Sequence, residues 1–313
     1  MDRPDDHTSW TRRDCLRGGI AAATGLTSLG LAAQAAESGT PESLSVLCFN
    51  ILAGGRRGLE ACAKLMTDSG ADIFGMQEVN ASGAKLEELT GLHRYERAGK
   101  QIFSRFPIGE ATPGKRGVKI DVPGTDGVWF FNDHLRPAPY QPYQLAQIPY
   151  GKNNPFITTE QEAISEAERA RGDQVDALLD DMAPALASGL PVILTGDFNE
   201  PSHLDWTRAA ADAKRCKIPV MWPASSRIAG AGLVDIYRSV FPDELEHPGH
   251  TWTPTPAKRD VPDRIDLIYA KGLAAESAAV IGESKEHADI VVKPFPSDHR
   301  AVLAKLKLPP ANR

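Results

Sequence analysis

The chain has 313 residues, of which 42% are hydrophobic and 24% are charged, and its formal net charge is −6 at pH 7. This length and composition are typical of a globular protein with a sizeable core, in one large domain or two ordinary ones. The negative charge excludes broad, sequence-independent binding to nucleic-acid backbones, which needs clustered Lys and Arg, although it leaves room for a locally positive cleft.

The N-terminal segment has the features of an export signal. The pair Arg12-Arg13 precedes a run of small and apolar residues, and Ala33-Gln34-Ala35 has the pattern of a cleavage site. The segment resembles a bacterial twin-arginine signal, with Cys15 where Phe is usual. Its apolar run is too short and too interrupted for a stable membrane span. We therefore expect residues 1–35 to direct export to the periplasm or the medium, with a disordered extension as the alternative, and residues 36–313 to form a single domain.

The cysteines indicate neither disulfides nor a structural zinc site. Cys15 lies in the signal, which leaves Cys48, Cys62 and Cys216, an odd number without a C-x-x-C pair. Cys48 stands in an apolar strand pattern, so we expect it to be a small core residue.

The first half of the domain alternates short apolar strands with turns. Helical spacing of apolar residues predicts helices over 59–67 and 85–89. A turn rich in Pro and Gly, 123–127, joins two strands as a hairpin. Apolar and β-branched runs predict the strands of this half, which cover 43–51, 71–79, 101–108, 118–122 and 128–132.

The second half opens with residues 136–157, which show no periodicity and predict a long surface loop. Its aromatic residues Tyr140, Tyr143, Tyr150 and Phe156 would either contact substrate or pack onto the body. Residues 159–182 predict a helix with a capping signal at its start. Further runs predict short helices over 203–208 and 233–238, and strands over 191–195, 264–269, 278–281 and 297–304.

The central strand, Pro191–Thr195, carries the first indication of chemistry. It is followed by Gly196, Asp197, Asn199 and Glu200, where the strand leaves the sheet. Buried strands seldom end in several acidic and amide groups, because each must be solvated, paired or bound to a metal. A polar turn after a core strand is the alternative.

Other predicted strands also begin or end with polar side chains. Carboxylate and amide oxygens suit Mg²⁺, Mn²⁺ or Ca²⁺, and two histidines beside them suit phosphoryl chemistry. Zinc is less favoured but remains open, because histidine is a good zinc ligand. Each histidine alone is more often a structural residue, and a partly exposed strand-end residue is the alternative for the glutamate. The set comprises Asn50, Glu78, His134, Asp197, Asn199, Asp266, Asp298 and His299.

These residues stand in motifs that resemble, in order, those of the endonuclease/exonuclease/phosphatase superfamily. The resemblance covers residues 44–306 and implies a four-layer α/β/β/α sandwich of two mostly antiparallel sheets flanked by helices. The motifs are Phe49-Asn50, Gln77-Glu78-Val79, Ser104-Arg105-Phe106-Pro107-Ile108, Asp133-His134-Leu135, Gly196-Asp197-Phe198-Asn199, Arg264-Ile265-Asp266 and Ser297-Asp298-His299.

The resemblance also implies the site's cofactor, a divalent metal for which Mg²⁺ is the first choice. Glu78 would be the principal ligand, with Asn50 beside it and Asp298 as a further ligand or support. Arg171 and Gln174, on the long predicted helix, match a looser position that we interpret as structural.

The same resemblance assigns roles to the other five residues. Asp197 would orient or deprotonate the attacking water, and Asn199 and His134 would donate hydrogen bonds to the phosphate and the transition state. His299 would contact the phosphate, with its imidazole held by Asp266 in the cationic form.

We therefore expect a metal-dependent phosphoesterase that acts on a small phosphodiester or phosphomonoester. The apurinic-site branch carries a tyrosine that is not evident here, and Lys and Arg are not clustered around any long loop, so nucleic acid is a less favoured substrate. An extracellular nuclease, a sphingomyelinase-like lipid phosphodiesterase and an inactive binding module are the alternatives. We expect a monomer without stable membrane insertion once the signal is removed.

Overall fold

The computed structural model describes residues 41–150, 155–253 and 260–309. The predicted export signal, 1–35, therefore lies outside the described residues. By its internal contacts the chain divides into the units Met1–Ser38 and Gly39–Arg313, and all described elements belong to the second. None of the helices in the described ranges combines the length and apolar character needed to cross a membrane.

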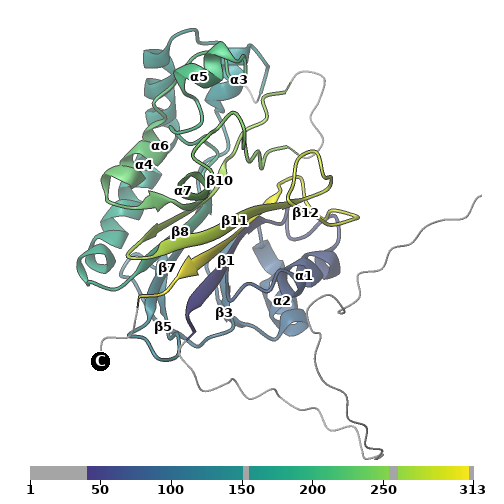
Figure 1. Cartoon of the computed structure of the whole chain (residues 1–313), viewed down its shortest axis with the longest axis vertical. Coiled ribbons are helices and arrows are strands. Elements are labelled where there is room, and N and C mark those ends of the chain that lie inside the picture. The colour runs from purple at the N-terminus through teal and green to yellow at the C-terminus, as the bar shows by residue number, and fades with distance from the viewer. Residues whose placement is uncertain (1–40, 151–154, 254–259, 310–313) are drawn as a thin grey trace, which may run out of the picture. The chain divides into compact units, whose positions relative to one another are not determined.

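The first sheet is built around the first strand, β1. Its order is β12-β11-β13-β1-β2-β4-β3, with β1 parallel to β2 and antiparallel to β13. Sequence-distant segments are thus neighbours at its centre (Figure 1). The strands are β1 (Ser43–Asn50), β2 (Ile73–Gln77), β3 (His93–Tyr95), β4 (Lys100–Ser104), β11 (Ala274–Gly282), β12 (Ile290–Val291) and β13 (Ala301–Lys307).

The second sheet has the order β5-β6-β7-β8-β10-β9. Its central strand β8 runs parallel to β7 and antiparallel to β10. The predicted hairpin is present, because β6 pairs with β7 in antiparallel register. The strands are β5 (Ile108–Ala111), β6 (Gly117–Ile120), β7 (Val128–His134), β8 (Val192–Asp197), β9 (Val234–Asp235) and β10 (Asp266–Lys271).

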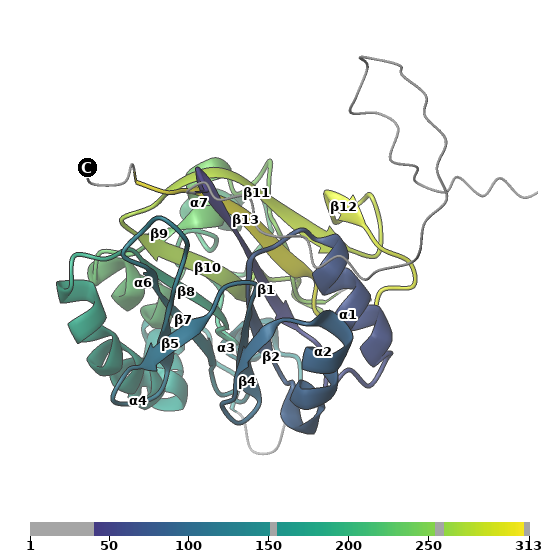
Figure 2. The same ribbon diagram turned by 90° about the horizontal axis from the view of Figure 1, so that it is seen from below.

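Helices cover the outer faces of both sheets. Figure 2 shows α1 and α2 on one side of the paired sheets and α4 and α6 on the other. The helices are α1 (Leu59–Asp68), α2 (Gly83–Thr90) after a 3₁₀ turn (Asn80–Ser82), α3 (Gln141–Ala146), α4 (Glu160–Ala187), α5 (Arg208–Asp212), α6 (Pro223–Gly230) and α7 (Ile236–Val240). The four-layer sandwich predicted from the sequence is confirmed.

Separate apolar clusters join the layers. Val46, Phe130 and Ile193 belong to a cluster between the two sheets, where opposing side chains interdigitate. The two sheets approach each other closely at Gly75 of β2, where a Cβ would lie 1.8 Å from Thr195 Oγ1 of β8. Cys48 belongs to this inter-sheet core, as predicted, and Cys48, Cys62 and Cys216 are all buried and free.

The predicted strand over 101–108 is wrong in one respect: it is two strands in different sheets. β4 ends at Ser104, whose hydroxyl accepts a hydrogen bond from the backbone N–H of Phe106. That contact turns the chain, and Pro107 has no N–H with which to continue a ladder. Ile108 then begins β5 in the second sheet.

The segment 136–157 also differs from the predicted surface loop, because it contains the buried helix α3. Gln141 and Gln144 are buried in this helix, and the side-chain amide of Gln141 donates to that of Gln144 over 3.1 Å. Gln144 in turn donates to the carbonyl of Pro155 over 2.8 Å. A six-residue helix that buries paired amides has no apolar period from which it could be predicted.

The other helices follow local signals where such signals exist. Thr159 and Glu162 form the predicted capping box at the start of α4. The helix predicted over 203–208 instead begins at Arg208, where the hydroxyl of Thr207 accepts the N–H of Ala210. No local pattern in the sequence predicts β3 or α6.

Candidate active site

Three neighbouring strands of the second sheet bring polar side chains into one row. His134, the last residue of β7, is in parallel register with Asp197, the last residue of β8. Asp266 begins β10 and also lies opposite Asp197, because β10 runs antiparallel to β8. Residues directly opposite each other on neighbouring strands project on the same face. This register therefore places three predicted site residues side by side.

The first sheet supplies Asn50 and Glu78 from the ends of the parallel strands β1 and β2. The Asn50 amide donates to Glu78 Oε1 over 3.2 Å and to Asp197 Oδ2 over 2.9 Å, so it joins the two sheets at this edge. Glu78 Oε2 accepts the N–H of Ala53 over 2.6 Å. Glu78 has φ of 57°, a left-handed conformation that is uncommon for a residue with a side chain and is concentrated at functional sites.

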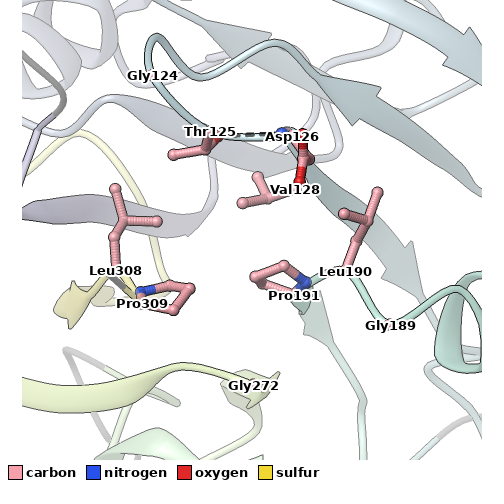
Figure 3. Close-up of a pocket in the computed structure, with 11 residues that line it drawn as sticks. Gly124, Thr125, Asp126, Val128, Gly189, Leu190, Pro191, Gly272, Leu308 and Pro309 are labelled. Carbon is pink, nitrogen blue, oxygen red and sulfur yellow. Dashed lines mark hydrogen bonds between the residues drawn. The ribbon is translucent and has the colours of Figure 1, made fainter. Parts of the chain in front are cut away.

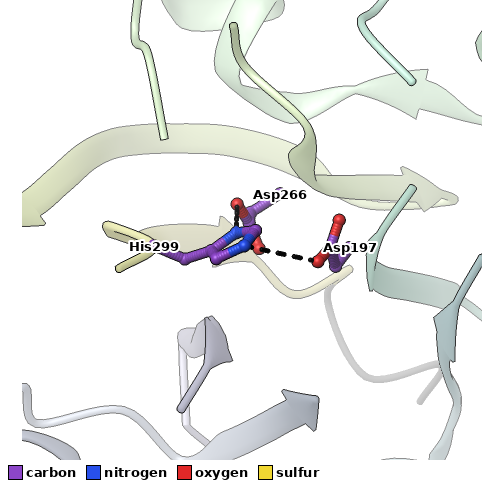
Figure 4. Close-up of side chains that lie close together, drawn as sticks. All are labelled: Asp197, Asp266 and His299. Atoms are coloured by element: carbon purple, nitrogen blue, oxygen red, sulfur yellow. Dashed lines mark hydrogen bonds and ion pairs between the residues drawn. The ribbon is translucent and has the colours of Figure 1, made fainter. Parts of the chain in front are cut away.

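A buried histidine lies between two carboxylates at the base of the site (Figure 4). His299 Nδ1 is 2.9 Å from Asp266 Oδ2, and His299 Nε2 is 3.8 Å from Asp197 Oδ2. Burial alone would lower the pKa of His299, but the carboxylates of Asp266 and Asp197 raise it to about 10. The ring is therefore protonated on both nitrogens at neutral pH, and its Nδ1 is hydrogen-bonded to Asp266.

Asp197 is held in place by donors from three segments. Its Oδ1 accepts the N–H of Asn199 over 3.0 Å, and its Oδ2 lies 3.4 Å from Nε2 of the half-buried His134. Asn199 has φ of 47°, and its side-chain amide donates a hydrogen bond to the carbonyl of Leu135 over 3.0 Å. In this arrangement Asn199 fixes the turn after β8, a role that the sequence did not suggest.

The donor set fits a hard divalent ion on the side of Glu78. Asp298 Oδ1 is buried and has no hydrogen-bond partner among the described residues, as expected of an oxygen that serves as a metal ligand. Asp298, Glu78 and Asp197 all line one cavity. Asp197, Asp266 and His299 also offer ligand atoms within 4.8 Å of one another, but His299 Nδ1 and Asp266 Oδ2 are already paired with each other at 2.9 Å. Asn50, Glu78 and Asp298 are therefore the better candidates for metal ligands.

The cavity beside these groups is small, at about 250 Å³. Its lining includes acids and histidines, and also aromatic residues of the segment 136–157 together with Trp252. A larger cavity of about 400 Å³ lies at the opposite end of β7 and β8 and is drawn in Figure 3. Its one carboxylate belongs to Asp126, and it has no histidine. The candidate catalytic groups therefore line the smaller cavity.

A basic cluster that sequence reasoning missed flanks the site. Arg97, Lys100 and Arg116 all approach the buried carboxylate of Asp133, at 3.5, 2.5 and 2.7 Å. Burial alone would raise the pKa of Asp133, but Lys100 and Arg97 lower it below its ordinary value. Asp133 Oδ1 also accepts the N–H of His134 over 2.8 Å, so the cluster anchors the end of β7.

The segment His250-Thr251-Trp252 supports the paired side chains of His299 and Asp266. The Thr251 hydroxyl accepts the backbone N–H groups of Ile265 and Asp266, both over 3.1 Å. The Trp252 ring lies against the His299 ring, with centroids 4.8 Å apart. These contacts hold the buried side chains of His299 and Asp266 in one orientation.

Comparisons with known proteins bear on the family and the fold. The model of the endonuclease/exonuclease/phosphatase family matches residues 47–299, which includes all the predicted site residues. A curated relative, an uncharacterized protein of Caenorhabditis elegans, is 25% identical over 302 aligned residues, 85% of this chain and 91% of that protein.

Solved structures share the fold at low sequence identity. An endonuclease/exonuclease/phosphatase from Beutenbergia cavernae is 18% identical, with a TM-score of 0.56 over 87% of this chain and 73% of that one. Truncated TDP2 from Caenorhabditis elegans is 19% identical, with a TM-score of 0.51 over 85% and 97%. The 3′ phosphatase NExo from Neisseria, bound to a product DNA hairpin, is 18% identical, with a TM-score of 0.52 over 83% and 98%.

Proposed function

Because the chain belongs to the endonuclease/exonuclease/phosphatase family, whose members are metal-dependent phosphoester hydrolases, we propose that its substrates are small phosphodiesters or phosphomonoesters. The observation that carries this proposal is the buried His299 ring, held between Asp266 and Asp197 at a cavity of about 250 Å³ that also presents Glu78 and Asp298. A small cavity with a fixed cation and several hard oxygen ligands fits a phosphate and one modest ester group.

The residues would divide the reaction between proton transfer and charge stabilisation. A divalent ion at Asn50, Glu78 and Asp298 would supply Lewis-acid stabilisation of the phosphate. Asp197 would accept the proton of the attacking water. Its orientation is fixed by the amide of Asn50 and by the N–H of Asn199.

The two histidines would act on the phosphate oxygens. The imidazolium of His299 would offset the negative charge that develops during in-line attack, and Asp266 keeps that ring charged and oriented. His134, half-buried beside Asp197, would donate to another phosphate oxygen. None of these roles requires a covalent intermediate with the enzyme.

A nuclease is the second candidate, and the cluster of Arg97, Lys100 and Arg116 favours it. Three cations surround one carboxylate there, each with about a fifth of its side chain exposed. The carboxylate of Asp181 accepts the backbone N–H of Arg116 nearby and offsets part of this excess. Activity on a polynucleotide would fall steeply with salt, because backbone contacts release counterions.

The proposal is tested by hydrolysis of bis(p-nitrophenyl) phosphate and p-nitrophenyl phosphate. The protein is stripped of metal and then given Mg²⁺, Mn²⁺, Ca²⁺ or Zn²⁺, with single-stranded DNA at rising salt as a second arm. We expect turnover to return with a divalent ion, and Glu78→Gln to lower kcat by about 100-fold or more. Glu88→Gln, an exposed position on α2, is the control and should keep full activity.

Two results would overturn the proposal. One is full turnover without metal or in the Glu78→Gln variant. Either result would show that Glu78 does not bind a metal that the reaction needs. The other is cleavage of the polynucleotide alone, which would transfer the assignment to the nuclease.

A further inference from the structure

Four aromatic side chains line the catalytic cavity: Tyr140, Tyr143, Tyr150 and Trp252. We call this set the aromatic wall. The catalytic groups described above do not account for it, and a phosphate has no use for an aromatic surface. Its rings are therefore available to the rest of the substrate.

Hydrogen bonds to residues behind the wall hold its rings in place. The Tyr140 hydroxyl donates to the buried carboxylate of Asp263 over 2.6 Å, and the Tyr143 hydroxyl donates to Asp260. Trp252 Nε1 donates to the Tyr143 hydroxyl over 3.1 Å. The polar atoms of these three side chains are thus engaged within the protein, which leaves the wall a mainly apolar surface.

The rings pack against one another and against the catalytic histidine. Tyr143 meets Tyr140 edge to face at a centroid distance of 4.9 Å, and meets Tyr150 in the same way at 5.4 Å. Trp252 lies on the His299 ring at 4.8 Å. The wall therefore begins at the group that contacts the phosphate, so a substituent one ester bond away from phosphorus would lie along it.

Tyr150 differs from the other tyrosines in its exposure. Tyr140 and Tyr143 are 4% and 8% exposed and support the wall, whereas Tyr150 is 38% exposed. Tyr150 thus presents the accessible part of the wall. Phe156, in the same segment, is 52% exposed but does not line the cavity.

From these contacts we infer that the aromatic wall is a ring-binding subsite, and that preferred substrates carry a flat unsaturated ring on the phosphate, as an aryl or nucleoside ester. This inference rests on the proposed function and adds a substrate class to it. At about 250 Å³ the cavity is below the usual range for drug-sized ligands and suits one ring beside a phosphate rather than a polymer.

The test compares methyl phosphodiesters whose second ester is phenyl, cyclohexyl or thymidine-5′-yl, so that the second ester supplies the one ring system available to the wall. Phenyl and cyclohexyl differ mainly in flatness, and the third ester separates nucleosides from simple aryl groups. We expect kcat/KM for phenyl to exceed that for cyclohexyl by about 10-fold beyond the uncatalysed ratio, as expected for aromatic packing. Tyr150→Ala should abolish this preference, and Phe156→Ala should retain it.

A binding measurement separates this inference from the proposed function. Calorimetry with phenylphosphonate and cyclohexylphosphonate, which are not hydrolysed, should show the same preference in the unaltered protein and its loss in Tyr150→Ala. Equal kcat/KM for the two esters would overturn the subsite while the phosphoesterase assignment stood. If no ester is cleaved with any metal, the proposed function fails, and equal binding of the phosphonates would then refute the subsite independently.

Discussion

The buried ion pair of Arg171 and Glu200 offers a quantitative test of the structure. Arg171 in α4 and Glu200, after β8, have side chains that are each 1% exposed, and Arg171 Nε donates to Glu200 Oε2 over 3.0 Å. The same guanidinium donates to the carbonyls of Arg136 and Pro139 over 3.2 and 3.1 Å. It thereby ties α4 to the segment that leads into the aromatic wall.

Replacement of one partner should be far more costly than replacement of both. Arg171→Met leaves the Glu200 carboxylate buried, with the N–H of Ala224 at 2.7 Å as its remaining donor. Removal of one member of a buried pair costs about 3–5 kcal/mol in the free energy of unfolding, whereas an apolar replacement of both is often near neutral. Arg171→Met with Glu200→Leu should therefore recover much of the loss, reduced by the two backbone carbonyls and the side-chain oxygen of Gln141 that remain without the guanidinium.

The loss should also depend on pH in a defined direction. Burial raises the pKa of Glu200 and the Arg171 charge lowers it, so without Arg171 this pKa rises further. The folded variant then holds a proton that the unfolded chain releases, and stability falls as pH increases between the unfolded and folded pKa values. The cost of Arg171→Met should thus be larger at about pH 8 than at about pH 5.5, because the unfolded glutamate titrates near 4.3.

Urea unfolding followed by circular dichroism at both pH values measures these differences. Arg169→Met is the matched control, because the Arg169 side chain in the same helix is 70% exposed and pairs with Glu166 at the surface. Such pairs contribute at most about 1 kcal/mol. A cost for Arg171→Met no greater than that of the control, or one that is the same at both pH values, would refute the buried pair as the source of stability.

Two further predictions concern stability. Gly75→Ala should cost about 1–3 kcal/mol by overpacking, because its Cβ would meet Thr195 Oγ1, whereas Gly230→Ala, with open space around it, should leave the unfolding midpoint nearly unchanged. Equal midpoints for the two variants would contradict the inter-sheet contact. Asp133→Asn should cost about 3–5 kcal/mol, because Arg97, Lys100 and Arg116 would face one another without their shared carboxylate. An unchanged denaturation midpoint would show that the Asp133 carboxylate does not stabilise the arrangement of these three cations.

The parts of this fold that were predictable depend on local or repeated signals. The capping box of Thr159 and Glu162 is contained within four residues, so the start of α4 was visible in the sequence. Polar groups at the ends of apolar strands indicated a site, and the order of the motifs indicated the family and its sandwich.

The remainder depends on contacts between distant segments. Asp197 meets His134 only because β7 and β8 are parallel neighbours, and neither strand carries that information alone. The three cations that contact Asp133 lie 17 to 36 positions before it in the chain. No run of charged residues therefore predicted the basic cluster. The aromatic wall was missed as a unit because its members become adjacent only when α3 packs onto the body.

The two ends of the domain meet at the site, and this has a consequence for the nascent chain. The Ser297 hydroxyl donates to the carbonyl of Asn50 over 2.6 Å, and β13 pairs with β1 along its length. Asn50 and Glu78 leave the ribosome before Asp298, His299 and β13 do. A nascent chain that has not reached β13 therefore lacks part of its catalytic apparatus. Hydrolytic activity requires synthesis to have passed this strand.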